Sequence, residues 1–144
     1  MHVLVIHGPN LNLLGQRQPE IYGSMTLAEL NDFLTTVAHD HGITIDCVQY
    51  NGEGEIINAI HDARSRYDGI VINPGAYSHY SYAIADAISS LDIPVIEAHL
   101  SNIAARETYR RVSVTAAACI GSISGFGQRS YALALRVLAE RAEN

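Results

Sequence analysis

Val3-Leu4-Val5-Ile6, near the start of the chain, is an unbroken apolar run in which three of the four residues are β-branched. Such a run is typical of a strand buried on both faces, as in a parallel sheet with helices on each side. Four further segments are predicted as strands, and most of them are also near-continuous apolar runs. They are residues 43–48, 69–72, 94–98 and 116–120.

Helical patterns separate these strands. Thr26 and Glu29 have the spacing of a capping box, and the apolar positions that follow share one helical face until Gly42 supplies a stop. Three more helices are predicted at about 53–66, 81–90 and 130–142. This alternation predicts one α/β domain over residues 1–144, a flavodoxin-like, doubly wound sheet of five parallel strands in the order 2-1-3-4-5 with helices on both faces.

The composition excludes several classes of function. The 144 residues carry a formal net charge of -6, so no nucleic acid and no membrane is expected as a partner. All nine basic residues are arginine, which excludes Schiff-base catalysis and a P-loop lysine. Cys47 and Cys119 lie far apart in apolar runs and are predicted as buried thiols. Together with the lack of a leader pattern, they predict a cytoplasmic protein.

Polar residues stand where three of the predicted strands end. Asn10 follows the first strand, Asn73 and His79 follow the third, and Glu97 and His99 lie at the end of the fourth. In an open α/β sheet, ligands bind outside the carboxyl ends of the strands. The convergence of amide, carboxylate and imidazole groups therefore predicts an active site at this edge.

Two connections are unusual for such a fold. Residues 8–25 form a link far longer than the roughly 2–6 residues usual between a strand and a helix, which is typical of a lid or binding loop. This link carries Arg17 and Tyr22. An arginine beside a phenol would lower its pKa from about 10 and make it a usable base, although both residues could instead serve loop packing. Residues 122–127 are predicted as a glycine-rich turn before the last helix.

Each polar residue also has a structural interpretation. Asn10 and Asn73 are residue types favoured in turns, and His99 could be a hydrogen-bonded core histidine. Ser101 is predicted as the N-cap of a short helical turn. The same turn would present the backbone N–H groups of Leu100 and Ser101 as a carboxylate site.

The segment 7–23, His-Gly-Pro-Asn-Leu-Asn-Leu-Leu-Gly-Gln-Arg-Gln-Pro-Glu-Ile-Tyr-Gly, resembles the opening signature of type II 3-dehydroquinate dehydratases. Two later blocks resemble the same family: Asn-Pro-Gly-Ala-Tyr-Ser-His at 73–79 and Glu-Ala-His-Leu-Ser-Asn-Ile at 97–103. Arg106, Arg110 and the glycine turn at 121–127 continue the resemblance. It covers nearly the whole chain in order and spacing, and the long first block is far more specific than a lone glycine motif.

The resemblance implies a reaction and an assembly. The family removes water from 3-dehydroquinate by trans-elimination through an enolate, giving 3-dehydroshikimate, in the shikimate pathway to chorismate and the aromatic amino acids. It uses no metal and no organic cofactor. The family assembles as a homo-oligomer, a dodecamer built from trimers.

The resemblance also implies roles for individual residues. Tyr22, as a tyrosinate, would remove the proton next to the ketone, and Arg17 would lower its pKa. Asn10 would position a water against the enolate oxygen. His99, oriented by Glu97, would protonate the departing hydroxyl. The further residues implied in support and substrate binding are Arg106, Asn73, His79, Leu100, Ser101, Arg110 and, from a neighbouring subunit, Asp86.

The sequence departs from the family pattern in a few places. Position 7 is His where many relatives have Asn, and 128–131 lacks the usual glycine before the tyrosine, which leaves the start of the last helix open. Thr108 and Tyr109 vary an aromatic pair between two arginines.

Three alternatives stay open: the same reaction in quinate catabolism, a non-catalytic ligand-binding domain, and a receiver-like signalling domain. A dinucleotide glycine motif or P-loop would favour the second and a strand-end lysine the third, and the sequence has none of these.

Overall fold

The computed structural model describes all 144 residues of the chain, apart from the side chain of Tyr22. Five strands form one parallel sheet in the order β2-β1-β3-β4-β5, which confirms the predicted fold class and strand order. The strands are β1 (His2–His7), β2 (Thr44–Gln49), β3 (Gly69–Asn73), β4 (Val95–His99) and β5 (Gly121–Ser124).

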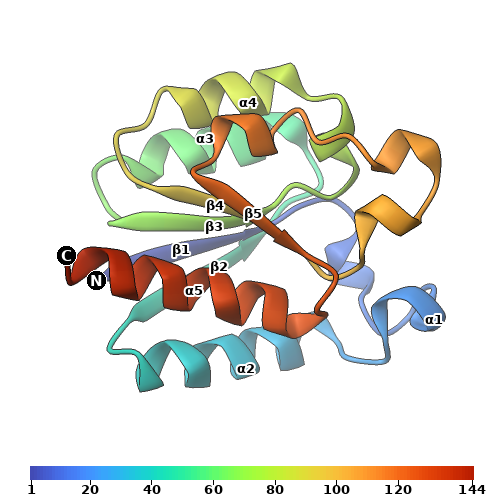
Figure 1. Cartoon of the computed structure of the whole chain (residues 1–144), viewed down its shortest axis with the longest axis horizontal. Helices are drawn as coiled ribbons and strands as arrows, with labels where there is room; N and C mark the ends of the chain where they lie inside the picture. Colours follow the sequence, from blue (N-terminus) through green and yellow to red (C-terminus); the bar gives the residue numbers. More distant parts are fainter.

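Helices cover both faces of this sheet (Figure 1). α2 (Leu27–Asp40) and α5 (Gln128–Ala142) lie side by side on one face, and α3 (Glu53–Ala63) and α4 (Tyr82–Ser89) on the other. None of the described helices combines the length and apolar character needed to span a membrane. The short helices are α1 (Pro19–Tyr22) and the 3-10 turns η1 (Leu11–Leu13), η2 (Gly75–His79), η3 (Ile103–Ala105), η4 (Thr108–Arg110) and η5 (Ala116–Ala118).

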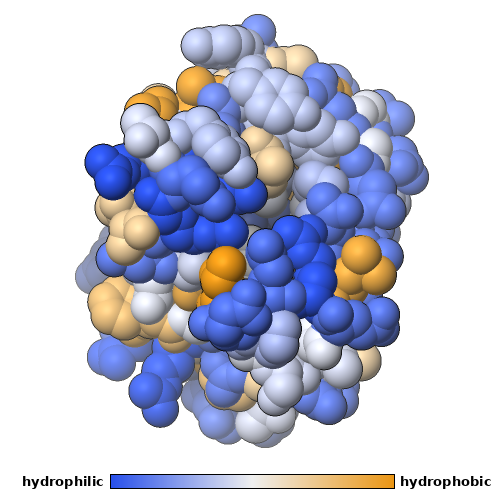
Figure 2. Space-filling view, turned by 90° about the vertical axis from the view of Figure 1, so that its right-hand side faces the viewer, coloured by the Kyte–Doolittle hydropathy of each residue, from blue (hydrophilic) through white to orange (hydrophobic). Residues whose placement is uncertain are grey.

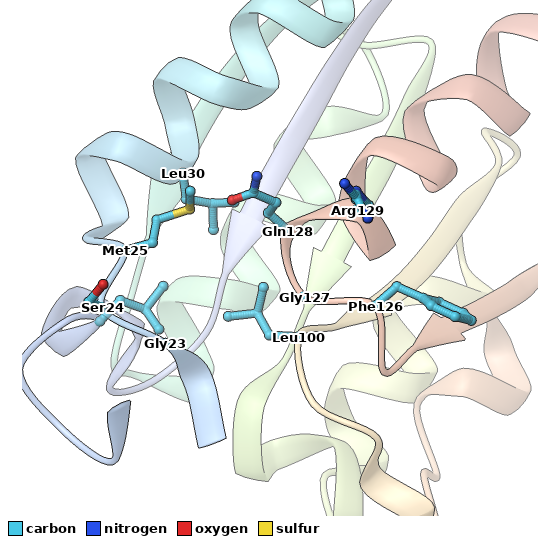
Figure 3. A pocket seen from close by; sticks show the side chains of 10 residues that line it. Gly23, Ser24, Met25, Leu30, Leu100, Phe126, Gly127, Gln128 and Arg129 are labelled. Atoms are coloured by element: carbon cyan, nitrogen blue, oxygen red, sulfur yellow. The ribbon is translucent and has the colours of Figure 1, made fainter. Parts of the chain in front are cut away.

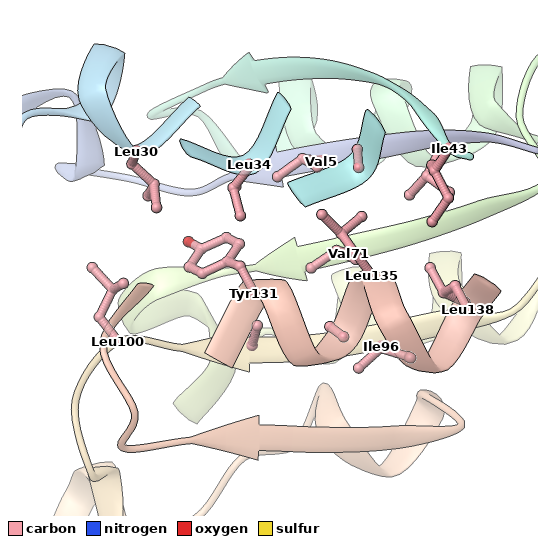
Figure 4. Close-up of a cluster of buried hydrophobic side chains, with 14 of the residues drawn as sticks. Val5, Leu30, Leu34, Ile43, Val71, Ile96, Leu100, Tyr131, Leu135 and Leu138 are labelled. Atoms are coloured by element: carbon pink, nitrogen blue, oxygen red, sulfur yellow. The ribbon is translucent and has the colours of Figure 1, made fainter. Parts of the chain in front are cut away.

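Each face of the sheet has its own hydrophobic core. Val3 and Val5 of β1 pack into the layer beneath α2 and α5, whereas Leu4 and Ile6 pack into the layer beneath α3 and α4. Figure 4 shows Val5 in the first of these layers. All four side chains are buried. Burial of each such side chain contributes about 1.5–3 kcal/mol, so a strand with no exposed face favours apolar residues at successive positions.

The predicted strand at 116–120 is wrong. Ala116–Ala118 form the turn η5, Ile120 is half exposed, and β5 lies at Gly121–Ser124, which overlaps the glycine-rich turn predicted at 122–127. β5 is an edge strand beside β4 and is not buried on both faces. Such a strand needs no apolar run, so the apolar pattern of the sequence does not predict it.

The predicted helices are present, with shifted ends. The capping box of α2 is confirmed: Glu29 N–H donates to Thr26 Oγ1 over 3.2 Å, and Thr26 N–H donates to Glu29 Oε2 over 3.3 Å. Gly42 follows this helix with a left-handed φ of 68°. α3 ends at Ala63 rather than at 66, and α5 begins at Gln128 rather than at 130.

The two cysteines are free thiols, partly rather than fully buried. Burial raises the pKa of Cys47 to about 11, with a contribution from Asp46. It also raises the pKa of Cys119 to about 12, with a contribution from Glu97. Both side chains are therefore protonated at neutral pH and unsuited to nucleophilic chemistry.

Gly8 brings the ends of β1 and β3 into direct contact. Its N–H donates to Asn73 O over 2.8 Å. A Cβ atom at this position would lie 2.6 Å from Pro74 C, 2.7 Å from Pro74 O and 2.8 Å from Asn73 O. These are backbone atoms that cannot turn aside, so only glycine lets the loops after β1 and β3 approach this closely.

We expect Gly8→Ala to lower the free energy of unfolding by about 1–3 kcal/mol, because the added methyl group overlaps the Pro74 backbone. Urea denaturation of the purified protein measures this loss. Gly54→Ala is the matched control, because a Cβ at Gly54 in the first turn of α3 would meet nothing within 4 Å. The control should be neutral or stabilising by up to about 1 kcal/mol. Equal losses in the two variants would contradict this account of Gly8.

Candidate active site

The carboxyl ends of the strands meet at one edge of the sheet, on the right-hand side of Figure 1. Figure 2 shows this edge face on: hydrophilic residues dominate it, and hydrophobic residues lie singly among them. The loops after β1, β3 and β4 emerge here. This is the edge at which the sequence predicts the site.

Glu97, on β4, is the buried charge at this edge, and its side chain is 0% exposed. His99 Nε2 lies 2.9 Å from Glu97 Oε2, and Ser113 Oγ donates to the same oxygen over 2.6 Å. Thr115 Oγ1 donates to the other carboxylate oxygen, Oε1. One carboxylate thus gathers three side chains from β4 and from the segment before η5.

The ionisation of Glu97 follows from these contacts. Burial alone would raise the pKa of Glu97, but the hydrogen bonds and charge of His99 and the hydroxyl groups of Ser113 and Thr115 outweigh it and hold the pKa below its usual range. The carboxylate is therefore ionised at neutral pH and can only accept hydrogen bonds. It follows that His99 carries a proton on Nε2, which leaves Nδ1 as the ring nitrogen available to a ligand.

Ser113 and Thr115 could not be linked to Glu97 from the sequence. They lie 16 and 18 residues further along the chain, in a segment without a motif. One signal could have indicated such partners: a carboxylate inside a strand that is buried on both faces needs hydrogen-bond donors from other segments of the chain.

The turn between β5 and α5 holds the end of β4 in place. Gly125 N–H donates to His99 O over 3.4 Å, and Gly127 N–H donates to Leu100 O over 2.9 Å. Gly125 has a φ of 96°, and a Cβ there would lie 3.2 Å from Asn102 Cβ. A close approach and a left-handed backbone both require glycine at this position.

The helix cap after β4 is shifted by one residue from its predicted position. Asn102, not Ser101, caps η3, and its Oδ1 accepts the Ala104 N–H over 3.2 Å. Leu100 is buried and Ser101 is half-buried. A carboxylate site at their backbone N–H groups stays a prediction.

Asn73 is buried at the end of β3 with a fixed amide orientation. Its Oδ1 accepts the Gly75 N–H over 3.0 Å, and its Nδ2 donates to the Tyr131 hydroxyl over 2.9 Å. The second Nδ2 hydrogen takes part in neither bond. Tyr131 comes from α5, 58 residues away, and sequence reasoning did not assign it to the site.

His79 also has one ring nitrogen committed to the protein. His79 Nδ1 lies 2.8 Å from Val112 O, and a carbonyl oxygen only accepts, so Nδ1 carries the proton. Tyr109 meets the His79 ring edge-on at 6.0 Å between centroids. Arg110 stacks on the Tyr109 ring and donates from Nε to Glu107 Oε2 over 2.7 Å. His79 and Arg110 therefore both contact the Tyr109 ring and lie in one cluster of side chains.

Asn10 is held in a left-handed conformation, with a φ of 67°. Its N–H donates to Asn51 Oδ1 over 3.0 Å, and the same oxygen accepts from Gln49 Nε2 over 3.0 Å. Gln49 Nε2 also donates to Gly8 O over 3.1 Å, and the Tyr77 hydroxyl donates to Asn51 O over 2.7 Å. Asn51, Gln49 and Tyr77, which sequence reasoning missed, thereby tie the loops after β1, β2 and β3 together.

Arg17, Asn10 and Leu14 line a small hollow in the long loop after β1. Leu14 also lines a larger hollow of ≈ 380 Å³, whose other walls include residues 23–25 and the turn at 126–129 (Figure 3). The predicted pairing of Arg17 with Tyr22 lies outside the described residues, because it needs the Tyr22 side chain.

Two other predicted residues differ in their surroundings. Arg106 is largely buried, and its Nε lies 3.9 Å from Glu107 Oε2. Asp86 is exposed on α4. Among the described residues, no group of three or more His, Cys, Asp or Glu side chains is placed to hold a metal ion.

We expect Glu97→Gln to lower the free energy of unfolding by about 3 kcal/mol at pH 7, because an amide cannot accept from all three donors. The folded-state pKa of Glu97 is depressed, so its ionisation stabilises the protein above its unfolded pKa of about 4.3 and less as pH falls through the folded pKa. The difference between wild type and variant should therefore shrink as the pH is lowered below about 4.3.

Urea denaturation at several pH values measures this difference. Glu140→Gln is the control, since Glu140 is exposed on α5 and pairs with Arg136 over 2.8 Å. Its loss should be about 0.5 kcal/mol or less. A pH-independent difference at position 97 would overturn the assignment of a buried carboxylate there.

Comparison with known proteins identifies the relatives of this chain. The sequence model described as "Dehydroquinase class II" matches residues 1–139. A 3-dehydroquinate dehydratase of Clostridium perfringens is 52% identical, over 100% of this chain and 99% of the relative. One from Caldanaerobacter subterraneus is 56% identical, over 92% of this chain and 90% of the relative.

The solved structures agree with these relatives. The type II dehydroquinase of Butyrivibrio crossotus superposes with a TM-score of 0.94 and 46% identity, covering 96% of this chain and 97% of that one. The relatives thus match this chain nearly from end to end in sequence and in fold, and the chain belongs to the class II dehydroquinase family.

Proposed function

We propose that this chain is one catalytic domain over residues 1–144 that dehydrates 3-dehydroquinate to 3-dehydroshikimate as a hydro-lyase. The observation that carries the proposal is the buried, ionised Glu97 fixing His99 at the carboxyl edge of the sheet, in a chain of this family. Within the proposed reaction, a proton is lost next to the ketone and a hydroxide equivalent leaves from the neighbouring carbon as water.

The first step is removal of the proton next to the ketone. Tyr22, as a tyrosinate, takes this proton and the electron pair moves onto the ketone oxygen, giving an enolate. Arg17 favours the tyrosinate by its positive charge, which is how a neighbouring cation lowers the pKa of a phenol. Asn10 positions a water that hydrogen-bonds to the enolate oxygen.

The second step is loss of the hydroxyl group. The enolate electrons re-form the ketone and push out the hydroxyl, which His99 protonates so that water leaves. The group that serves is His99 Nδ1, because Nε2 is bonded to Glu97. His99 gives up the proton on Nδ1, and the bond between Nε2 and Glu97 keeps Nδ1 directed toward the hydroxyl.

The remaining polar groups hold the substrate. Asn73 and the backbone N–H groups of Leu100 and Ser101 bind the carboxylate. His79 and Arg110 bind the ring hydroxyls, and His79 does so through Nε2 because Nδ1 is bonded to Val112 O. Arg106 supports the base electrostatically from behind.

The residue inventory favours an enolate over an imine. The chain contains no lysine, so an imine with the substrate ketone cannot form. Neither a metal ion nor an organic cofactor takes part in the proposed steps.

The setting of the enzyme follows the same proposal. The chain forms a homo-oligomer, a dodecamer of trimers, in which Asp86 reaches the site of a neighbouring subunit. The enzyme is cytoplasmic and acts in the shikimate pathway to chorismate and the aromatic amino acids. Quinate catabolism uses the same reaction and the same site, so growth of a deletion strain without aromatic amino acids separates the two roles.

Chelator-treated protein should convert 3-dehydroquinate to a product with the ultraviolet absorbance of a conjugated enone, and borohydride in a parallel run should leave the rate unchanged. Tyr22→Phe should abolish this turnover, because it removes the proton acceptor. Tyr67→Phe should retain it, since the Tyr67 hydroxyl bonds Asp46 at 2.8 Å, at the amino-terminal end of β3. Folded wild type without turnover would favour a non-catalytic binding domain instead, and turnover in Tyr22→Phe would remove Tyr22 as the base.

His99→Ala should slow dehydration by about 10²-fold or more, because protonation of the hydroxyl is lost. Exchange of the proton next to the ketone, followed by NMR in D2O, should slow much less, since it needs only the base. His61→Ala, on the exposed surface of α3, should change neither rate. If exchange and dehydration fell together in His99→Ala, the stepwise acid role would be wrong.

A further inference from the structure

A line of buried polar side chains lies behind Asn73, inside the hydrophobic layer beneath α2 and α5. Tyr131 of α5 is 0% exposed and lies among the apolar side chains of this layer (Figure 4). Its hydroxyl contacts Asn73 Nδ2 at 2.9 Å and His7 Nδ1 at 3.2 Å. His7 is also 0% exposed, and its Nε2 lies 2.8 Å from Asn31 Oδ1 on α2. Four elements thus meet through four polar side chains.

The protons of this line can be assigned one after another. Gly75 N–H is a donor, so the Asn73 atom that faces it is the accepting oxygen Oδ1. The other Asn73 atom, Nδ2, therefore faces Tyr131 and donates to its hydroxyl oxygen. The hydroxyl proton of Tyr131 must then go elsewhere, because a buried donor without an acceptor is costly.

The acceptor for that proton is His7. Nδ1 of His7 is the other polar atom beside the Tyr131 hydroxyl, and it can accept only as an unprotonated nitrogen. The His7 proton is then on Nε2, where it is donated to Asn31 Oδ1. In this arrangement the Tyr131 hydroxyl proton and the His7 proton each have an acceptor, and a proton on His7 Nδ1 would leave the Tyr131 hydroxyl without one.

The surroundings keep both groups in these forms. Burial lowers the pKa of His7 to about 4, against a smaller opposing effect from the Asn31 hydrogen bond, so His7 is neutral at pH 7. Burial raises the pKa of Tyr131 far above its usual value, with the Asn73 hydrogen bond opposing it and Cys47 adding to it. The line is therefore uncharged and directional.

We propose that Tyr131 and His7 are positioning residues of the active site, which lock the Asn73 amide with its second Nδ2 hydrogen facing the substrate. This rests on the proposed function, in which Asn73 binds the substrate carboxylate. The Gly75 N–H and Tyr131 fix the two ends of the amide, so a carboxylate meets a donor. Without the Tyr131 oxygen, the Gly75 N–H holds only the oxygen end of the amide, and the Nδ2 end can tilt away from the substrate.

Tyr131→Phe removes this oxygen and keeps the ring in the core. We expect KM for 3-dehydroquinate to rise about tenfold while kcat stays within about threefold. The reason is that a contact with the carboxylate stabilises the bound substrate and the transition state equally. Tyr67→Phe, which also deletes a hydrogen-bonded tyrosine hydroxyl, should leave both constants unchanged. An unchanged KM in Tyr131→Phe, or a fall confined to kcat, would overturn the proposal.

A matched pair at position 7 tests the acceptor. His7→Asn places an amide oxygen where Nδ1 stands and can still accept from Tyr131, so KM should stay near the wild-type value. His7→Leu fills the space without an acceptor, so KM should rise as in Tyr131→Phe. Equal KM values in the two variants would show that the Tyr131 proton does not depend on His7.

The tautomer of His7 tests the line without any substrate. Imidazole ¹⁵N chemical shifts of the wild type at pH 7 should report a neutral His7 with its proton on Nε2, the signal being identified by its loss in His7→Asn. A proton on Nδ1, or on both nitrogens, would overturn the assignment. Wild type that shows this tautomer but no turnover would instead mean that the proposed function is wrong while the line of hydrogen bonds is right.

Discussion

A carboxylate that is completely buried yet ionised, that of Glu97, constrains most of the site edge. Removing such a charge from water costs several kcal/mol unless donors replace the lost hydration. The donors are His99, two positions along β4, and Ser113 and Thr115 from the segment before η5. That segment must therefore fold back across the end of β4 before the chain can go on to form β5. The orientation of His99 and the path of the segment that carries Ser113 and Thr115 thus both depend on this one carboxylate.

Three functional side chains at this edge each bind the protein with one end and leave the other end free for a substrate. His99 has Nε2 bonded to Glu97, His79 has Nδ1 bonded to Val112 O, and Asn73 has its oxygen bonded to Gly75. In each case the bond to the protein fixes the tautomer of the imidazole or the orientation of the amide, and so determines which atom faces the substrate. A substrate then meets groups that lose little rotational freedom on binding, which is how preorganisation raises affinity and rate.

Much of the fold could be predicted because its signals are local. The apolar run at Val3–Ile6 and the capping box at Thr26 depend on neighbours in the sequence, and the structure places a buried strand and a helix start there. β5 was missed because an edge strand has little need for an apolar pattern. The partners of the site residues were missed for another reason: Tyr131 meets Asn73 across 58 residues, and Thr115 meets Glu97 across 18. Residues so far apart in the sequence come into contact only when the sheet and its helices have folded.

In the proposed reaction, the base lies on a long loop and the acid lies at the end of a strand. These two parts of the chain differ in their backbone hydrogen bonds. Among the described residues, the backbone hydrogen bonds of the segment 11–23 are local, from Leu11 N–H donating to Gly8 O through to Gly23 N–H donating to Pro19 O. His99, by contrast, closes a strand paired with β3 and β5 and is bonded to a buried carboxylate. In the proposed mechanism the side chain of the acid is therefore in position before the substrate arrives, whereas the position of the base depends on the conformation of the long loop. Because the enolate forms before the hydroxyl leaves, loop placement governs the first step and the rigid strand end governs the second.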